Sequence, residues 1–249
     1  MAKKTQFTIE GRELSYPTRF WEGSSLLGIF LVPLDAANKI IAASGFKAAR
    51  LLPGKAGLII TGVHYTDSAC EQYEELAFAF FVEEHPATGS RSSLYNLRLL
   101  AKGKLPSYTW YLPVTSTLAQ QCGIQMWGYP KTIEDLRFSQ ADQTAEIALH
   151  RDGEKILSYS VKAKGKSETK ESPAPVYSVY EGQPQVGYLM QKFSQAGYRP
   201  GGGKLVISDH PLMQPLRELG LPKKPLLSGW MGQLDFTMSA PALLENPSE

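Results

Sequence analysis

Short apolar runs, broken every few residues by Gly, Pro, Asp or Ser, are the feature that most constrains the fold of this chain. The runs are rich in Val, Ile, Phe and Tyr, which favour extended strands. We predict strands over residues 26–32, 56–64, 75–82, 108–114, 145–149, 156–163, 186–193 and 205–208. No long helical pattern alternates with them, so a doubly wound parallel sheet is unfavourable and a largely antiparallel barrel or sandwich is favoured.

Helical signals are few and short. Two helices are predicted from a capping residue and a stop: residues 36–44 between Asp35 and Gly45, and residues 117–122 between Ser116 and Gly123. Asp209 and Pro211 predict the start of a third, short helix toward Leu219. Residues 162–175 mix both charges with Ser and Pro, and we expect a solvated loop between strands there.

The composition limits the class of protein. Lys and Arg number 26 against 24 Asp and Glu, a net charge of +2, and 43% of the residues are hydrophobic. Such a chain can build a large core, and we predict one domain over residues 1–249. It lacks the concentrated excess of Lys and Arg that nucleic acids or anionic membranes require, so we expect neither as a partner.

The compartment is predicted from what the chain does not contain. The N-terminal lysines precede no apolar run, and the longest apolar stretch, residues 26–34, is too short to span a bilayer and contains Pro33. Cys70 and Cys122 form no disulfide framework. We therefore expect a soluble, cytoplasmic protein.

The common motifs of metal and cofactor sites are missing from the sequence. The four histidines, at positions 64, 85, 150 and 210, show no HxH or HExxH spacing, and neither cysteine has a CxxC partner. Three glycines precede Lys204, but Leu205 follows where a phosphate loop needs Ser or Thr. There is no GxSxG or GxGxxG. We expect no metal and no organic cofactor.

One segment indicates chemistry: Ile-Gln-Met-Trp-Gly-Tyr-Pro-Lys-Thr at residues 124–132. Pro130 restricts Tyr129 to extended conformations, so we predict a strand through the lysine, with Trp127, Tyr129 and Lys131 on one face. On an open face the ammonium would form a structural cation–π pair. In a closed cavity, desolvation would lower the pKa of Lys131 and favour the nucleophilic amine.

The sequence W-G-Y-P-K resembles the segment around the Schiff-base lysine of acetoacetate decarboxylase and its relatives. Further similar segments occur in the same order over most of the chain: residues 34–37, 64–68, 73–75 with the strand 77–82, 205–211, 215–216 and 227–244. Only W-G-Y-P-K is specific by itself.

The resemblance implies a mainly β, single-domain fold: a closed, cone-shaped, mostly antiparallel β-barrel with a few short helices. Its interior would hold Lys131 as the nucleophile that forms an iminium with a small keto acid, without a cofactor. The decarboxylases of the family form large homo-oligomers, so the resemblance also implies a homo-oligomer.

A glutamate and several binding residues are implied as well. The Tyr-x-Glu spacing makes Glu75 the acid, base or orienting carboxylate, whereas counting from His64 selects Glu74; strand alternation allows only one of them to face the cavity. Trp127, Tyr129 and His64 are the further candidates for substrate binding.

Two positions depart from the family pattern. Thr132 follows Lys131 where the decarboxylases carry a second lysine, and in a strand it would point away from the cavity. The family's arginine before the first barrel strand has no counterpart at residues 22–25, so Arg19 is the nearest candidate. An imine-dependent aldolase or dehydratase, or a non-catalytic barrel whose tyrosines and phenylalanines line an apolar ligand cavity, therefore remain alternatives to a decarboxylase.

Overall fold

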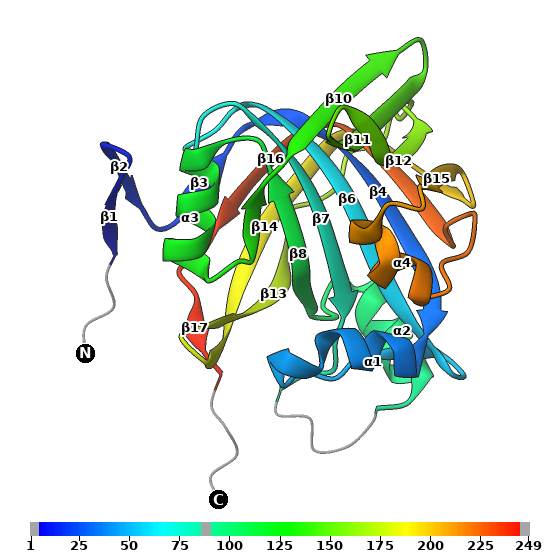
Figure 1. The fold of residues 1–249 in the computed structure, drawn as a ribbon. Coiled ribbons are helices and arrows are strands. Elements are labelled where there is room, and N and C mark those ends of the chain that lie inside the picture. The colour runs from blue at the N-terminus through cyan, green and yellow to red at the C-terminus, as the bar shows by residue number, and fades with distance from the viewer. Residues whose placement is uncertain (1–4, 86–90, 245–249) are drawn as a thin grey trace, which may run out of the picture.

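A ring of strands forms the centre of the computed structural model, which describes residues 5–85 and 91–244 (Figure 1). The ring belongs to an 11-stranded sheet and closes because β14 pairs with both β13 and β16. Its strands, in ring order, are β14 (Gln183–Pro200), β13 (Ser172–Tyr180), β8 (Ser107–Val114), β7 (Tyr73–Phe81), β6 (Lys55–Asp67), β4 (Glu22–Pro33) and β16 (Leu227–Met238). Only the pairing of β8 with β13 is parallel within this ring. The predicted mainly β, mostly antiparallel fold is confirmed.

A second, 4-stranded sheet packs against the outside of β4, β6 and β7. It consists of β10 (Asp135–Ala141), β11 (Thr144–Arg151), β12 (Glu154–Lys162) and β15 (Gly203–Ile207). The remaining strands are short: β1 (Gln6–Ile9), β2 (Arg12–Ser15), β3 (Thr18–Phe20), β5 (Arg50–Leu52), β9 (Lys131–Ile133) and β17 (Ala242–Leu243). Every predicted strand overlaps an observed one. The loop predicted over residues 162–175 is confirmed between β12 and β13, but its last four residues belong to β13.

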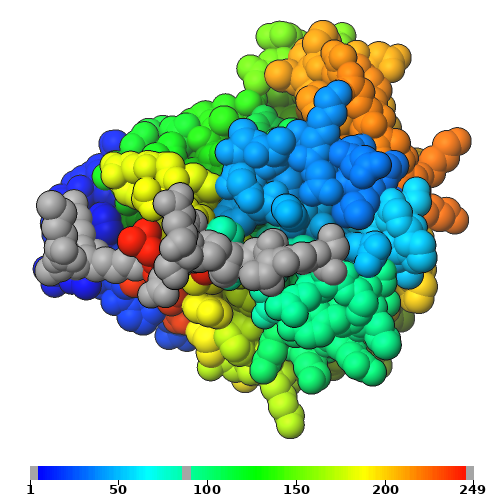
Figure 2. Space-filling model, turned by 90° about the horizontal axis from the view of Figure 1, so that it is seen from below, coloured from blue at the N-terminus to red at the C-terminus, as the bar shows by residue number. Residues whose placement is uncertain are grey.

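The helices are α1 (Leu34–Ile41), α2 (Ser93–Ala101), α3 (Thr117–Trp127) and α4 (Gln214–Glu218), with 3-10 turns η1 (Ala42–Ser44) and η2 (Pro211–Met213). Gly45 ends the first helical segment as predicted, but Asp35 lies in its first turn and does not cap it. Helix α2 was not predicted. Figure 2 shows α1 and α2 on the face seen from below. No helix in the described parts of the chain is long and apolar enough to cross a membrane.

Strands β6 and β7 separate two environments because their side chains alternate. Leu76, Phe78 and Phe80 of β7 are completely buried, in a core that they share with Ile147 and Tyr159 of the second sheet. The intervening side chains of β7 point into the ring, where they line a cavity. The largest hydrophobic cluster therefore lies between the two sheets, whereas the inward residues of the ring line the cavity and contribute to two smaller clusters.

Candidate active site

Helix α3 and the turn that ends it bring Lys131 back to the ring. As predicted, Ser116 caps the helix: its hydroxyl accepts a hydrogen bond from the backbone of Ala119 at 3.2 Å. The helix ends at Gly128, whose φ of 65° lies in the left-handed region that glycine tolerates. After this turn, β9 begins at Lys131 and runs parallel to β8.

The predicted strand over residues 124–131 is therefore wrong except at Lys131, and the predicted helix end at Gly123 is wrong as well. Residues 124–127 belong to α3. Pro130 restricts only the residue before it, Tyr129. Gly123 lies inside α3 with a helical backbone, so it does not end the helix. Its missing side chain has another use: a methyl group there would lie 2.6 Å from Cε of Lys131, so the lysine packs directly on the helix backbone.

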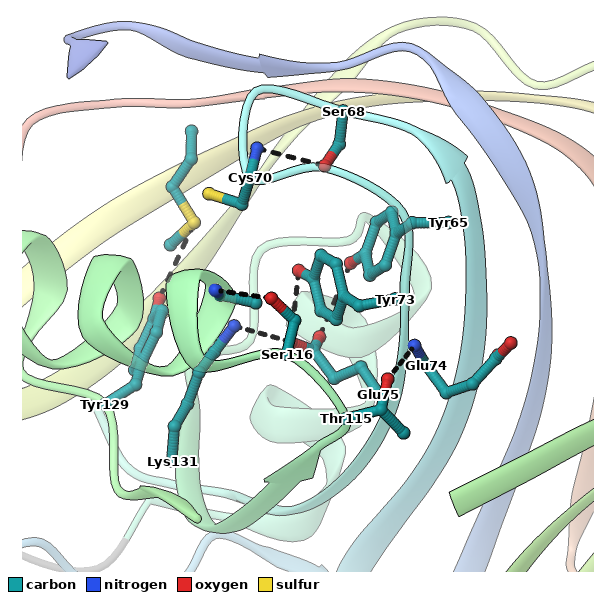
Figure 3. Close-up of polar contacts among 12 residues, drawn as sticks. Tyr65, Ser68, Cys70, Tyr73, Glu74, Glu75, Thr115, Ser116, Tyr129 and Lys131 are labelled. Atoms are coloured by element: carbon teal, nitrogen blue, oxygen red, sulfur yellow. Dashed lines mark hydrogen bonds and ion pairs between the residues drawn. The ribbon is translucent and has the colours of Figure 1, made fainter. Parts of the chain in front are cut away.

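The amine of Lys131 forms an ion pair with Glu75 of β7. Nζ lies 2.8 Å from Oε2 of Glu75, and the two side chains are only 7% and 13% exposed (Figure 3). The same nitrogen lies 5.1 Å from the centre of the Tyr73 ring, within cation–π range. The structure thus joins the predicted nucleophile and one predicted carboxylate in a nearly dry environment.

Two tyrosines hold the carboxylate of Glu75. The hydroxyls of Tyr65 and Tyr73 donate to its two oxygens at 3.4 Å each, and the two rings stack with centres 4.4 Å apart. Burial is the main cause that raises the pKa of both phenols well above the ordinary value, and the charge of Glu75 is the second. Both tyrosines therefore stay protonated and act as hydrogen-bond donors.

A cavity of about 400 Å³ adjoins this pair inside the ring. Trp127 and Tyr129 line it as predicted, with ring centres 6.4 Å apart. The pKa of Tyr129 is raised, mainly by burial. Of the described residues in the cavity wall, Lys131 is the only cation and Glu75 the only anion. Thr132 is absent from this wall, in line with the prediction that it points away.

Three predicted substrate-binding residues lie outside the cavity. Glu74 points away from Lys131 (Figure 3), because it is adjacent to Glu75 on a strand. Its Oε1 lies 2.7 Å from Nδ1 of His64, whose ring stacks on Phe138 of the second sheet, and this hydrogen bond raises the pKa of His64. The choice between the two glutamates thus falls on Glu75.

Arg19 is also placed elsewhere. It lies on β3, its side chain is 59% exposed, and its guanidinium forms a surface ion pair with Asp235 at 3.0 Å. The ion pair holds the cation outside the cavity wall, so the structure does not bring Arg19 to the predicted site.

Three residues of the site were not among the predicted ones: Tyr65, Tyr73 and Gly123. Tyr73 precedes Glu75 by two residues, so strand alternation could have placed both on one face. Tyr65 requires the pairing of β6 with β7, which sets it opposite Tyr73. No sequence signal relates Gly123 to Lys131, because their contact depends on the turn at Gly128.

Groups suited to a metal are not found at this site. Within the described ranges, no three His, Cys, Asp or Glu side chains are grouped closely enough to hold one. Cys70 and Cys122 are buried, free thiols. The hydrogen bond with Cys70 is the main cause that lowers the pKa of Cys122; burial opposes it, and the charge of Lys131 adds to the lowering.

Solved structures with a similar fold cover nearly the whole chain. Acetoacetate decarboxylase from Legionella pneumophila matches with a TM-score of 0.70 at 15% identity, over 99% of this chain and 92% of that chain. The enduracididine biosynthesis enzyme MppR in complex with pyruvate matches with a TM-score of 0.62 at 17% identity, over 94% and 93%. MppR in complex with the condensation product of pyruvate and imidazole 4-carboxaldehyde matches with a TM-score of 0.63 at 17% identity, over 94% and 92%.

Comparison of sequences gives the family itself. None of the curated proteins matches the chain. The family model described as acetoacetate decarboxylase matches residues 7–247. Because this match spans almost the entire sequence and includes both Lys131 and Glu75, the chain belongs to the acetoacetate decarboxylase family.

Proposed function

We propose that this protein is a cofactor-independent lyase that removes carbon dioxide from a β-keto acid through an iminium on Lys131. One observation carries the proposal: a nearly buried amine lies in a cavity wall with a carboxylate 2.8 Å away. Surface lysines are far more common, and a lysine in such a cavity is a candidate nucleophile. Membership of the family supports the same reaction.

The first step requires a neutral amine, and Glu75 is the acceptor for its proton. When the carboxylate takes that proton, Nζ attacks the ketone carbon and forms a carbinolamine. Glu75 then returns a proton to the oxygen, which leaves as water and gives the iminium. The hydroxyls of Tyr65 and Tyr73 keep the carboxyl group in place throughout.

The second step uses the iminium as an electron sink. The bond between the α-carbon and the carboxylate breaks, carbon dioxide leaves, and the electron pair flows into the iminium to give an enamine. A proton delivered to the α-carbon and hydrolysis of the regenerated iminium release the ketone and free Lys131. The apolar, mostly closed surroundings favour loss of a charged carboxylate as a neutral gas.

Reductive trapping tests the proposal. Borohydride added with acetone or acetoacetate should give one stable adduct by intact mass, mapped by peptide analysis to Lys131. Lys131→Arg should abolish both the adduct and carbon dioxide release while the protein still folds, because a guanidinium supplies no free amine. Lys155→Arg, at a lysine that pairs with Glu146 on the surface, is the matched control and should retain both. An adduct elsewhere, or activity in Lys131→Arg, would refute the assignment.

Imine-dependent condensation is the second candidate. Apart from Lys131, the described cavity wall contains no cation that could hold a substrate carboxylate, which favours this reaction. The likeness to MppR, whose structure contains a condensation product of pyruvate, favours it as well. Product analysis with pyruvate and an aldehyde, against carbon dioxide release from acetoacetate, separates the two reactions. A carrier without catalysis would give no adduct in either case.

The proposal includes a cytoplasmic homo-oligomer of single-domain subunits, with the ring of strands as the family's cone-shaped barrel. This assembly is what the resemblance to the family's decarboxylases implies, and light scattering coupled to size-exclusion chromatography measures it.

A further inference from the structure

The cavity beside Lys131 continues far along the inside of the ring. On β7, every second residue from Tyr73 to Phe81 lines it. At about 3.3 Å per residue, the distance from Glu75 to Phe81 is roughly 20 Å. Strand β6 contributes in the same way from Tyr65 to Ile59. The cavity therefore runs along the strands from the amine toward α2, which lies below the ring in Figure 1.

Small side chains keep this passage open. Ala77 and Ala79 occupy the middle of β7, between Glu75 and Phe81, so the strand presents only methyl groups there. Beyond them the wall is formed mainly by hydrocarbon side chains such as Ile59, Leu100 and Leu105. Hydroxyls of Ser and Thr interrupt it, but no charged side chain from the described residues does.

The two ends of the cavity differ. Around the amine the lining side chains are buried: Tyr65 and Tyr73 are each 3% exposed. At the other end Phe81 and Leu105 are also buried, at 7% and 5% exposed, but Leu100 is half-buried and Gly103 is exposed. A ligand with its carbonyl at Lys131 would therefore direct the rest of its length along the apolar passage toward the surface.

A small keto acid does not fill this space. The volume of about 400 Å³ lies in the range of about 300–1,000 Å³ that is typical of pockets for drug-sized ligands. Acetoacetate is much shorter than the roughly 20 Å from Glu75 to Phe81. A 3-oxo acid with a longer apolar chain would extend along this distance.

We infer that the substrate class is a 3-oxo acid with an unbranched apolar chain, whose tail lies along Ala77 and Ala79 while its ketone reacts with Lys131. This inference rests on the proposed function and specifies its substrate. The reaction is R–CO–CH₂–COO⁻ + H⁺ → R–CO–CH₃ + CO₂. The carbon–carbon bond to the carboxylate breaks, its electron pair ends in the new C–H bond, and an apolar methyl ketone leaves.

A chain-length series tests it. Carbon dioxide release is measured for 3-oxobutanoate, 3-oxohexanoate, 3-oxooctanoate and 3-oxodecanoate, with the spontaneous rate subtracted. The value of kcat/KM should rise about four-fold per methylene, the equivalent of about 0.8 kcal/mol for each buried CH₂. A flat or falling series, with acetoacetate still decarboxylated and Lys131 still trapped, would overturn this inference alone. No adduct and no carbon dioxide from any acid would instead overturn the proposed function and the inference with it.

Narrowing the passage gives an independent test. Ala79→Phe should lower the ratio of kcat/KM for 3-oxodecanoate over 3-oxobutanoate at least ten-fold, because the added ring blocks the tail. Ala141→Phe, the same change at an exposed strand position, should keep the wild-type ratio. An unchanged ratio in folded Ala79→Phe would contradict the placement of the tail.

The wild-type protein supplies a measurement that does not depend on the variants. Methyl ketones from 2-butanone to 2-nonanone should inhibit with inhibition constants that fall steadily with chain length. Constants independent of length would contradict the inference.

Discussion

Replacing Gly123 by alanine should disable the site without harming the fold. The added methyl group would lie 2.6 Å from Cε of Lys131, whereas apolar carbons settle at about 3.5–4.0 Å. The lysine side chain must therefore move by about 1 Å, away from its position 2.8 Å from Glu75. The helix backbone cannot yield as easily, because it is held by its own hydrogen bonds and by the turn at Gly128.

The size of the effect follows from this displacement. A reacting group misplaced by about 1 Å costs on the order of 10²-fold in rate, so kcat should fall about a hundred-fold. Stability should not fall in parallel, since alanine is preferred over glycine inside a helix by about 1 kcal/mol. Loss of rate with retained stability separates this effect from general damage to the fold.

Three measurements check the prediction: carbon dioxide release, the rate of borohydride trapping, and unfolding in urea. Gly187→Ala is the matched control, because a methyl group there would first meet Met238 at 3.4 Å, an ordinary contact. It should behave like the wild type in all three assays. A Gly123→Ala enzyme with wild-type activity, or equal losses in both variants, would refute the reasoning.

Other expectations follow from the same geometry. Glu75→Gln should lower kcat by about 10²–10⁴-fold, because the proton acceptor of Lys131 is lost, and steady-state kinetics measures this. The hydrogen bond with Glu74 raises the folded-state pKa of His64 above its unfolded value of 6.5. The stability that the His64–Glu74 pair contributes is therefore complete below pH 6.5 and disappears as the pH rises through the folded-state pKa. Urea unfolding of the wild type and Glu74→Gln should therefore differ most near pH 5.5 and least near pH 8.5; an equal difference at both would contradict the pairing. Arg19→Ala should leave kcat/KM unchanged, because this side chain lies on the surface. A large drop in kcat/KM would show that Arg19 takes part in substrate binding.

The strands could be predicted because their signal is local. Alternating and apolar runs mark β4, β6, β7 and β8 directly in the sequence. Closure of the ring was implied by the resemblance to the family and could not be predicted from the local patterns, because it depends on the parallel pairing of β8 with β13 and on the pairing of β14 with β16. Both join residues that are distant in the chain, and no periodicity encodes such partners.

Helix α2 escaped prediction for a physical reason. Its apolar residues do not form a buried stripe: Leu94 and Leu97 are 59% and 36% exposed, and Asn96 is the residue that is buried. Asn96 donates hydrogen bonds to the backbone of Arg50 and to Glu83 instead. A helix held by a buried amide lacks the periodic pattern by which amphipathic helices are recognised.

The candidate site was predictable in its parts and not in its assembly. Strand alternation showed that only one of Glu74 and Glu75 could face the cavity, but which one depends on the side that the second sheet covers. Trp127 and Tyr129 reach the cavity although the strand predicted for them is partly a helix. The turn at Gly128 changes the direction of the chain and so brings both side chains to the cavity, which strand alternation was expected to do.

Stability and chemistry lie on opposite faces of the same strand. The outward residues of β7, such as Phe78 and Phe80, are completely buried between the sheets, and truncating either to alanine should cost about 3–5 kcal/mol. The inward residues Ala77 and Ala79 border empty space, so enlarging them changes what the cavity admits before it changes what holds the sheets together. Substitutions on the inner face of the ring can therefore change which ligand the cavity admits. The packing between the two sheets, and with it the position of Lys131, stays the same.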